Sequence, residues 1–232
     1  MIQNIYDNLW AQYCAAVDDN RFQLDPNIIN PTDNRRGITA LAYLAANNHS
    51  VCQRIDQFLH QAQCIEPEQY YQPFNERHLT LLSIITCAAG FNLTDINSTD
   101  YIEALKQVLH HVEPIEVEFR GVTASPACIM IQGFPVGSGL NDLRDKLRQH
   151  FSQAPLASTI DSRYKLITAH CSVIRFCVPL QQRQKLKALC QQYQHYPFGR
   201  VRFSQFELVF NDWYQTLSAG KSLAQYSLSE PC

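Results

Sequence analysis

HLTLLSIIT (residues 78–86) and KLITAHCSVIRFCV (residues 165–178) are the two segments from which the fold of this chain is most directly predicted. Both are rich in apolar and β-branched residues, as is typical of β-strands, and each contains a histidine with a hydroxyl residue two positions later. Because successive side chains of a strand point to opposite faces, His78 should share a face with Thr80, and His170 with Ser172. The sequence therefore predicts two strands that each present an imidazole beside a hydroxyl group.

Helical and strand patterns alternate along the rest of the chain. Apolar residues recur at intervals of three and four, which predicts helices, in residues 3–18, 50–63, 100–111, 140–151 and 181–193. Further strand patterns lie in residues 38–46, 115–122, 127–134 and 199–210. With the histidine strands the order reads β-α-β-α-β twice, which predicts an α+β fold. We expect two pseudo-symmetric lobes with antiparallel or mixed sheets flanked by helices, and an active site in the cleft between them.

The first 36 residues stand apart from this alternation. After the N-terminal helix, residues 20–36 hold two prolines and four asparagines, which favours a connector. We therefore expect residues 1–36 to form a helix and connector, and residues 37–232 to form the two-lobed domain.

Composition narrows the class of protein. Apolar residues make up 46% of the chain, enough for a packed core, and the net charge of -2 predicts no broad basic surface for duplex binding. A nucleic-acid substrate should therefore be small or locally held. Neither a leader segment nor an apolar run of the ~20 residues that span a bilayer is present, so we expect a cytoplasmic monomer without membrane contact.

The nine cysteines are scattered and contain no CxxC pair, so we expect reduced, mostly buried thiols. The more specific alternative to free thiols is a structural zinc site. It is disfavoured because Cys171, beside His170, would point to the opposite face of a strand. We expect neither a metal nor a cofactor.

Two facing histidine–hydroxyl units offer a specific chemistry. Imidazole can accept or donate a proton near neutral pH, and a neighbouring hydroxyl can donate a hydrogen bond to an anionic oxygen. Together, such units could supply a base for the nucleophile, an acid for the leaving oxygen and donors for phosphate oxygens. This predicts a metal-independent phosphoesterase that acts on a ribose 2′,3′-cyclic phosphate.

The pattern of a histidine followed by a hydroxyl residue occurs three times in the chain. The third copy, His150 and Ser152, ends a predicted helix, where residues two apart face away from each other. The alternative for the other two copies is that both histidines are hydrogen-bonded residues of sheet cores.

HLTL at residues 78–81 and HCSV at residues 170–173 resemble the paired H-x-T/S-x motifs of the two-histidine (2H) phosphoesterase superfamily, which includes LigT-like RNA 2′,3′-cyclic phosphodiesterases, also called 2′-5′ RNA ligases. The resemblance runs from about residue 37 to residue 228. It implies a bilobal α+β fold, and it implies that His78 and His170 are the acid and base while Thr80 and Ser172 hold phosphate oxygens. RNA ends or cyclic nucleotides would be the substrates.

Two further residues are candidates for substrate binding. Arg175 matches an arginine of the family and could neutralise the phosphate, but five residues after His170 it would face the other side of the strand unless a β-bulge intervenes. Tyr71, with Tyr70 and Phe74, lies in the segment before His78 and could stack on a base. Arg163 and Lys165 are candidates for distal phosphates, with a solvated surface role as the alternative.

Two other functions stay open. The chain could be an RNA- or nucleotide-binding module with weak turnover, or a phosphodiesterase that cleaves cyclic oligonucleotide signals with the same histidines.

Overall fold

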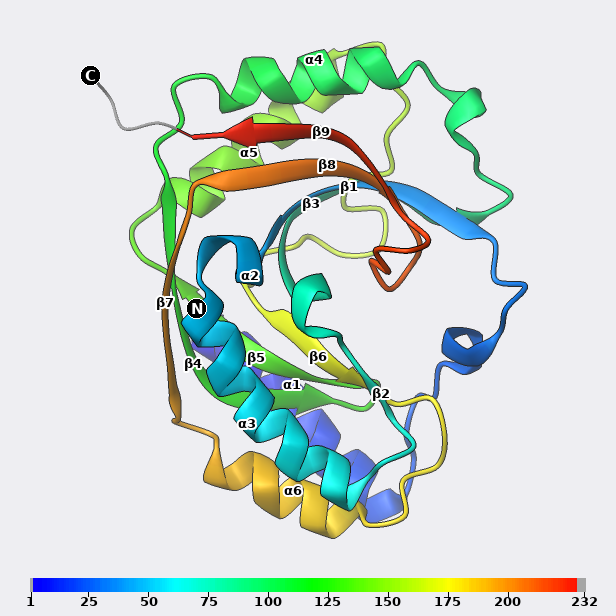
Figure 1. Cartoon of the computed structure of the whole chain (residues 1–232), viewed down its shortest axis with the longest axis vertical. Coiled ribbons are helices and arrows are strands. Elements are labelled where there is room, and N and C mark those ends of the chain that lie inside the picture. The colour runs from blue at the N-terminus through cyan, green and yellow to red at the C-terminus, as the bar shows by residue number, and fades with distance from the viewer. Residues whose placement is uncertain (1, 229–232) are drawn as a thin grey trace.

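The two histidine motifs belong to different antiparallel sheets. The computed structural model describes residues 2–228 and contains a four-stranded sheet A, in the order β3-β1-β8-β9, and a five-stranded sheet B, in the order β2-β6-β5-β4-β7 (Figure 1). His78 is the first residue of β3 (His78–Ala89), an edge strand of sheet A. His170 directly precedes β6 (Cys171–Arg175), an inner strand of sheet B.

Every strand pair in both sheets is antiparallel, so the mixed arrangement that the sequence left open does not occur among the described residues. Sheet A also contains β1 (Arg35–Tyr43), β8 (Gln205–Asn211) and β9 (Lys221–Ser227). Sheet B also contains β2 (Tyr70–Tyr71), β4 (Ile115–Ser125), β5 (Cys128–Pro135) and β7 (Pro197–Phe203). The expected α+β architecture of two helix-flanked sheets is confirmed.

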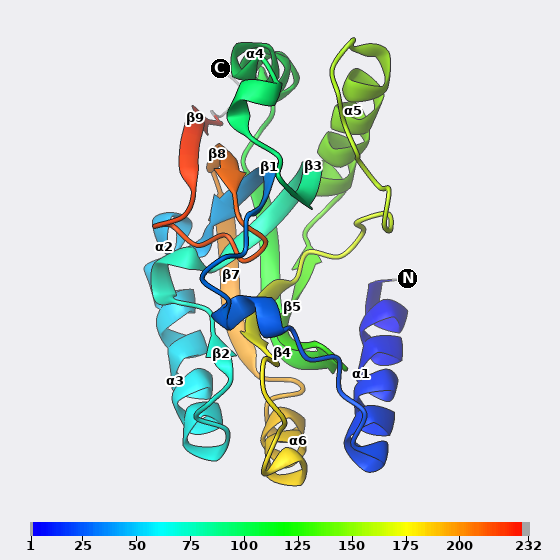
Figure 2. The same ribbon diagram turned by 90° about the vertical axis from the view of Figure 1, so that its right-hand side faces the viewer.

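Each sheet has its own helices, as Figures 1 and 2 show. The helices are α1 (Ile2–Asp19), α2 (Leu44–Asn47), α3 (His49–Ile65), α4 (Ser98–Leu109), α5 (Gly139–Gln153) and α6 (Arg183–Gln192). Helix α5 packs against β3 and helix α4 against β9, whereas α1 and α6 pack against β4 and α3 packs against β7. The two helix layers thus lie on opposite outer sides and leave the space between the sheets to the histidine motifs.

Local sequence accounts for these helices. In α3, the apolar side chains at helical spacing, Val51, Ile55, Phe58, Leu59 and Ala62, are all buried. The side chain of Asn48 accepts a hydrogen bond from the Val51 amide and so caps the first turn. All five helices predicted from apolar periodicity are confirmed, with bounds shifted by one or two residues. The short helix α2 was not predicted.

Two strand predictions were wrong in their extent. The run at 199–210 is two strands, because the chain leaves sheet B after β7 and enters sheet A at β8, with Ser204 between them. The run at 165–178 is a strand only over β6, so His170 is not itself in a strand. In addition, the strand predicted at 38–46 ends at Tyr43, and β2 and β9 were not predicted.

The predicted order β-α-β-α-β occurs twice along the chain, as β1-α3-β3-α4-β4 and β5-α5-β6-α6-β7, but the two halves do not form separate sheets. Sheet A combines β1 and β3 with the late strands β8 and β9, while sheet B takes the early strand β2. Near the N-terminus, the predicted helix forms as α1, and Arg35 and Arg36, expected in the connector, begin β1.

The described residues contain no helix that is both long and apolar enough to cross a membrane. Between residues 2 and 228, no group of three or more histidine, cysteine, aspartate or glutamate side chains is placed to hold a metal ion. The eight cysteines in this range are free thiols, and Cys232 lies outside it, as do the last four residues of the predicted domain.

Candidate active site

A single cavity of about 730 Å³ collects most of the predicted site residues. His78 and Thr80 of sheet A line it, as do Ser172 and Arg175 of sheet B and His170 just before β6. The volume lies in the range that holds a molecule the size of a nucleotide. The two motifs therefore border one common space, contributed by both sheets.

A β-bulge brings Arg175 to the cavity. Along β5 and β6, Ile129 pairs with Ile174 but the next residue, Met130, pairs with Ser172, so Val173 is an extra residue in β6. Because the bulge shifts the alternation by one position, Arg175 lies on the same face as Ser172 instead of the opposite one. The buried Nε of Arg175 has no hydrogen-bond partner among the described residues. Arg175 therefore has an unused buried donor at the cavity.

The ring of His78 is held by the main chain before β3. Its Nδ1 lies 2.7 Å from the carbonyl oxygen of Glu76, which can only accept, so Nδ1 carries the proton and Nε2 carries the lone pair of the neutral ring. The neighbouring Arg77 is buried, donates to the carbonyl of Cys52 at 3.0 Å and forms an ion pair with Asp56. These contacts hold the segment that carries His78 in place.

His170 is held by a hydroxyl and by a close main-chain approach. Its Nδ1 lies 2.7 Å from Oγ1 of Thr168. On the neighbouring strand, a Cβ placed on Gly133 would lie only 2.0 Å from the carbonyl oxygen of Ala169. Glycine is needed there because any side chain would push the main chain next to His170 away from β5.

One buried arginine connects the two motifs. Arg144 of α5 is 1% exposed and donates to the carbonyl oxygens of Thr80 at 2.7 Å, Leu81 at 2.9 Å and Ile167 at 3.1 Å. Burial lowers the pKa of this guanidinium to about 10, with Arg148 as the next contributor. A single side chain thus spans the first motif and the segment that leads to the second.

Both histidines are neutral at pH 7 in the free protein. Burial lowers the pKa of His78 to about 4, while the hydrogen bond to Glu76 opposes the shift and Arg175 adds to it. Burial also lowers the pKa of His170 to about 4, and the positive charges of Arg144 and Arg175, together with that of His78 whenever His78 is protonated, lower it further. Since an anionic phosphate would offset these positive charges, binding of a phosphoester should raise both pKa values.

The remaining candidates divide into two groups. Arg163 and Lys165 line the cavity, and the Arg163 guanidinium lies 4.5 Å from the ring centre of Trp213, which also lines it. Tyr71 is not among the cavity residues, and its hydroxyl donates to the carbonyl of Glu66 at 2.9 Å. Tyr70 and Phe74, from the same segment, likewise do not line the cavity.

Thr168, Arg144 and Trp213 were not predicted from the sequence. Thr168 could have been found, because hydroxyl residues stand two positions before and two positions after His170. Arg144 carries no local signal, since it sits on the otherwise apolar, buried face of α5. Trp213 follows β8, and only the sheet topology brings it to the histidines.

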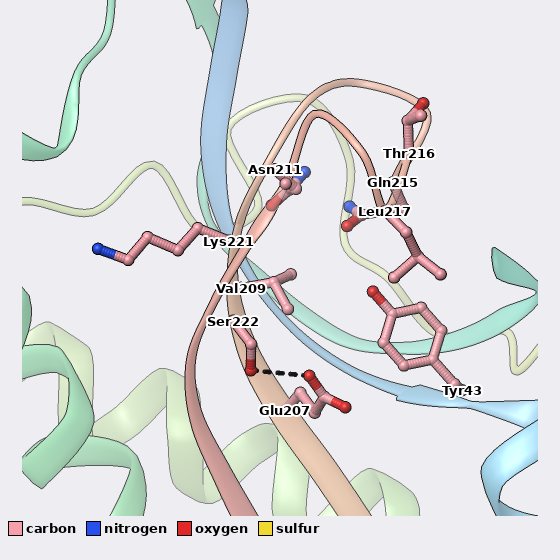
Figure 3. Close-up of a pocket in the computed structure, with 10 residues that line it drawn as sticks. Tyr43, Glu207, Val209, Asn211, Gln215, Thr216, Leu217, Lys221 and Ser222 are labelled. Carbon is pink, nitrogen blue, oxygen red and sulfur yellow. Dashed lines mark hydrogen bonds between the residues drawn. The ribbon is translucent and has the colours of Figure 1, made fainter. Parts of the chain in front are cut away.

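A second, smaller pocket of about 50 Å³ adjoins the cavity (Figure 3). Asn211 and Gln215 line both spaces and therefore form the wall between them. Oδ1 of Asn211 and Oε1 of Gln215 have no hydrogen-bond partner among the described residues, whereas Glu207 accepts a hydrogen bond of 2.9 Å from Ser222. The pocket is large enough for water but not for a nucleotide.

Comparison with known proteins gives no match among protein-family models or curated proteins. Solved structures do match. TT0787 of Thermus thermophilus is 15% identical with a TM-score of 0.56, and the alignment covers 83% of this chain and 97% of that one. A protein described as a phosphoesterase is 12% identical with a TM-score of 0.53 and coverage of 84% and 99%.

LigT from E. coli, solved in complex with 3′-AMP, is 11% identical with a TM-score of 0.52, and the alignment covers 84% of this chain and 99% of LigT. One of these neighbours is described as a phosphoesterase and another is LigT. The resemblance seen in the two histidine motifs is thus confirmed at the level of fold. This chain has the two-lobed α+β fold of the LigT-like phosphoesterases.

Proposed function

We propose that this chain is a phosphoesterase that hydrolyses 2′,3′-cyclic phosphate ends of RNA, or related cyclic nucleotides, to phosphomonoesters. The observation that carries this proposal is the arrangement of His78 and His170 with Thr80, Ser172 and Arg175 around one cavity. This set contains two groups able to transfer protons and three donors able to bind phosphate oxygens. One chain supplies all five residues, so a monomer in the cytoplasm would suffice for the reaction.

In the proposed reaction one histidine takes a proton from water as the water oxygen bonds to phosphorus. The bond from phosphorus to one ribose oxygen of the ring breaks, and the other histidine gives that oxygen its proton. Thr80, Ser172 and Arg175 stabilise the negative charge on the remaining phosphate oxygens. Exchange of one proton with water then restores both histidines.

We assign the acid role to His78 and the base role to His170. The carbonyl of Glu76 accepts from Nδ1 of His78 at 2.7 Å and so stabilises the protonated ring. Arg175 acts on both rings, but His170 is also influenced by the positive charge of Arg144, which favours the neutral ring. A bound phosphate would raise the pKa of both rings, and His78 would be the first to hold a proton.

The fold gives further support. LigT, whose fold this chain shares, was crystallised with 3′-AMP, a nucleotide of the kind that opening of a 2′,3′-cyclic ring produces. A nucleotide substrate also suits the size of the cavity.

The test is a turnover assay on adenosine 2′,3′-cyclic phosphate and on an oligonucleotide with a cyclic end, in the presence of a metal chelator. Wild-type protein should open the ring, and His78→Ala or His170→Ala should each lower kcat by roughly two to four orders of magnitude. Absence of ring opening by the wild type contradicts the proposal. If the protein binds the nucleotide without any product, it is a binding module, and if only 3′,5′-linked cyclic oligonucleotides are cleaved, it acts on those signals.

A further inference from the structure

The N-terminal helix α1 forms part of the wall of the active-site cavity. Ile5 and Leu9 line the same cavity as the histidines, and both are half-buried. They are four residues apart, so they lie next to each other on one face of the helix. Figure 2 shows α1 beside β4 and β5, with its N-terminal end toward the segment that leads into β6. An apolar face of α1 therefore borders the space where the proposed substrate binds.

The residue next to Ile5 anchors the helix to the main chain beside His170. Tyr6 is 1% exposed, and its hydroxyl donates to the carbonyl of Gly133 at 2.9 Å and accepts from the Gly133 amide at 3.1 Å. In addition, Thr123 donates to the carbonyl of Tyr6 at 3.0 Å. These contacts hold Ile5 and Leu9 in a defined position relative to His170.

The apolar character of this wall extends onto sheet B. Ala127 precedes β5, Met130 lies within it, and both line the cavity together with Ile5 and Leu9. Leu82, Leu166, Ile167 and Trp213 also line the cavity, and its polar residues include the two histidines with Thr80, Ser172 and Arg175. The cavity thus combines a polar part suited to a phosphate with an apolar part suited to a flat, weakly hydrated group. A nucleobase is the part of a nucleotide with that chemistry.

We propose that Ile5 and Leu9 of α1 form the contact surface for the nucleobase of the substrate and so determine how tightly nucleotides bind. This inference rests on the proposed function, because it names the part of the nucleotide that lies against α1. It gives residues 2–19 a direct role in substrate binding. A helix that served only to cover sheet B would not distinguish a substrate with a base from one without.

The experiment compares Leu9→Ala and the double variant Ile5→Ala/Leu9→Ala with wild type in the full chain. Leu24→Ala is the matched control, since Leu24 is 37% exposed and does not line the cavity. The dissociation constant for 3′-AMP is measured by calorimetry, which needs no turnover. KM and kcat are measured for adenosine 2′,3′-cyclic phosphate and for glycerol 1,2-cyclic phosphate, which has no base.

We expect Leu9→Ala to weaken 3′-AMP binding about threefold to tenfold, as loss of part of an apolar contact predicts, and to raise KM for the adenosine substrate similarly. Leu9→Ala should leave kcat for adenosine 2′,3′-cyclic phosphate unchanged. It should also leave KM and kcat for glycerol 1,2-cyclic phosphate unchanged, so that these values equal those of wild type and of Leu24→Ala. Equal losses on both substrates, or no change in 3′-AMP binding, would overturn the inference.

Failure of the proposed function gives a different result. If wild-type protein opens neither cyclic ester but binds 3′-AMP in a manner that depends on Leu9, the hydrolytic function is wrong and the base contact stands. If wild-type protein neither opens the esters nor binds 3′-AMP, both proposals are wrong.

Discussion

Arg144 donates a hydrogen bond of 2.7 Å to the carbonyl oxygen of Thr80, and the same guanidinium reaches the carbonyl of Ile167 at 3.1 Å. The two histidine motifs, on different sheets, are thus joined by a side chain from α5 that belongs to neither. Because this guanidinium is buried, its positive charge also acts on His170 and lowers the pKa of that ring. Arg144 is therefore a positioning residue in the proposed site.

Replacement of Arg144 by methionine should affect both stability and pH dependence. Three main-chain carbonyls, one of them fully buried, would lose this donor, so we expect the free energy of unfolding in urea to fall by about 1–3 kcal/mol. Loss of the positive charge should raise the pKa of His170, visible as a shift of the pH profile of kcat/KM to higher pH. Arg200→Met, which removes an exposed ion pair with Glu116, is the control and should leave the profile in place. An unchanged profile in Arg144→Met would contradict the electrostatic role.

The assignment of acid and base predicts that the two histidine variants differ with the leaving group. The ribose oxygen of a cyclic phosphate needs a proton to leave, whereas p-nitrophenolate does not. His78→Ala should therefore lose much more activity on adenosine 2′,3′-cyclic phosphate than on bis(p-nitrophenyl) phosphate, and His170→Ala should lose activity on both. The reverse pattern would exchange the two roles.

The lowered pKa values predict that acid destabilises the protein through the histidines. In the unfolded chain both rings titrate near ~6.5, but folded His78 and His170 have pKa values of about 4, so the unfolded state binds more protons between these values. The stabilising contribution is complete above pH ~6.5 and is lost as the pH falls toward 4, by up to about 1.4 kcal/mol per pH unit for each histidine. Urea unfolding at pH 7.0 and 5.0 measures it.

The control for this prediction is the variant His78→Asn/His170→Asn, which lacks both rings. Other groups titrate equally in the two proteins, so the difference between their pH dependences isolates the histidines. Identical losses of stability between pH 7.0 and 5.0 in wild type and variant would show that the histidine pKa values are not lowered.

Gly133→Ala should disturb the catalytic centre without changing any residue that lines it. The added Cβ would lie 2.0 Å from the carbonyl oxygen of Ala169, so the main chain next to His170 must move. We expect a lower kcat on the cyclic substrate and a loss of roughly 1–3 kcal/mol in unfolding free energy. Gly139→Ala, whose Cβ would meet nothing within 4 Å, should match wild type in both measurements.

Local patterns predicted the elements well, because the spacing of apolar residues is itself a local property. The hairpin of β4 and β5 and the helices α1, α3, α4, α5 and α6 all follow from such spacing. Partner choice between strands is not local. Nothing in residues 199–210 shows that the chain changes sheets at Ser204, since both sides of that residue alternate as strands do.

The site residues that could be recognised by their type and spacing were predicted from the sequence. The parts of the site that depend on contacts between residues far apart in the sequence were not. His78, Thr80, His170 and Ser172 could be chosen from the sequence, and they do line one cavity. The segment before His170 reads as a strand, but Arg148 and Arg144 of α5 bind the carbonyls of Leu166 and Ile167. Side chains from another element thus take the place of strand pairing there.

The face of β6 on which Arg175 lies could not be predicted from the sequence either. The guanidinium of Arg175 faces the cavity only because Val173 is an extra residue in β6. The amino-acid sequence around Val173 contains no signal for a β-bulge. Tyr71 shows the converse, because an aromatic residue close to His78 in sequence is used for a hydrogen bond to Glu66 instead of for the cavity.

The exchange of strands between the sheets also has a consequence for the order of folding during synthesis. Strand β8 lies between β1 and β9, and Gly37 pairs with Asn211, so sheet A cannot be completed until the last fifth of the chain has left the ribosome. Until then β1 has an unpaired edge, and the first histidine motif has no finished sheet around it. A chain that ends before β8 would thus keep both motifs in its sequence and still be unable to assemble the cavity between them.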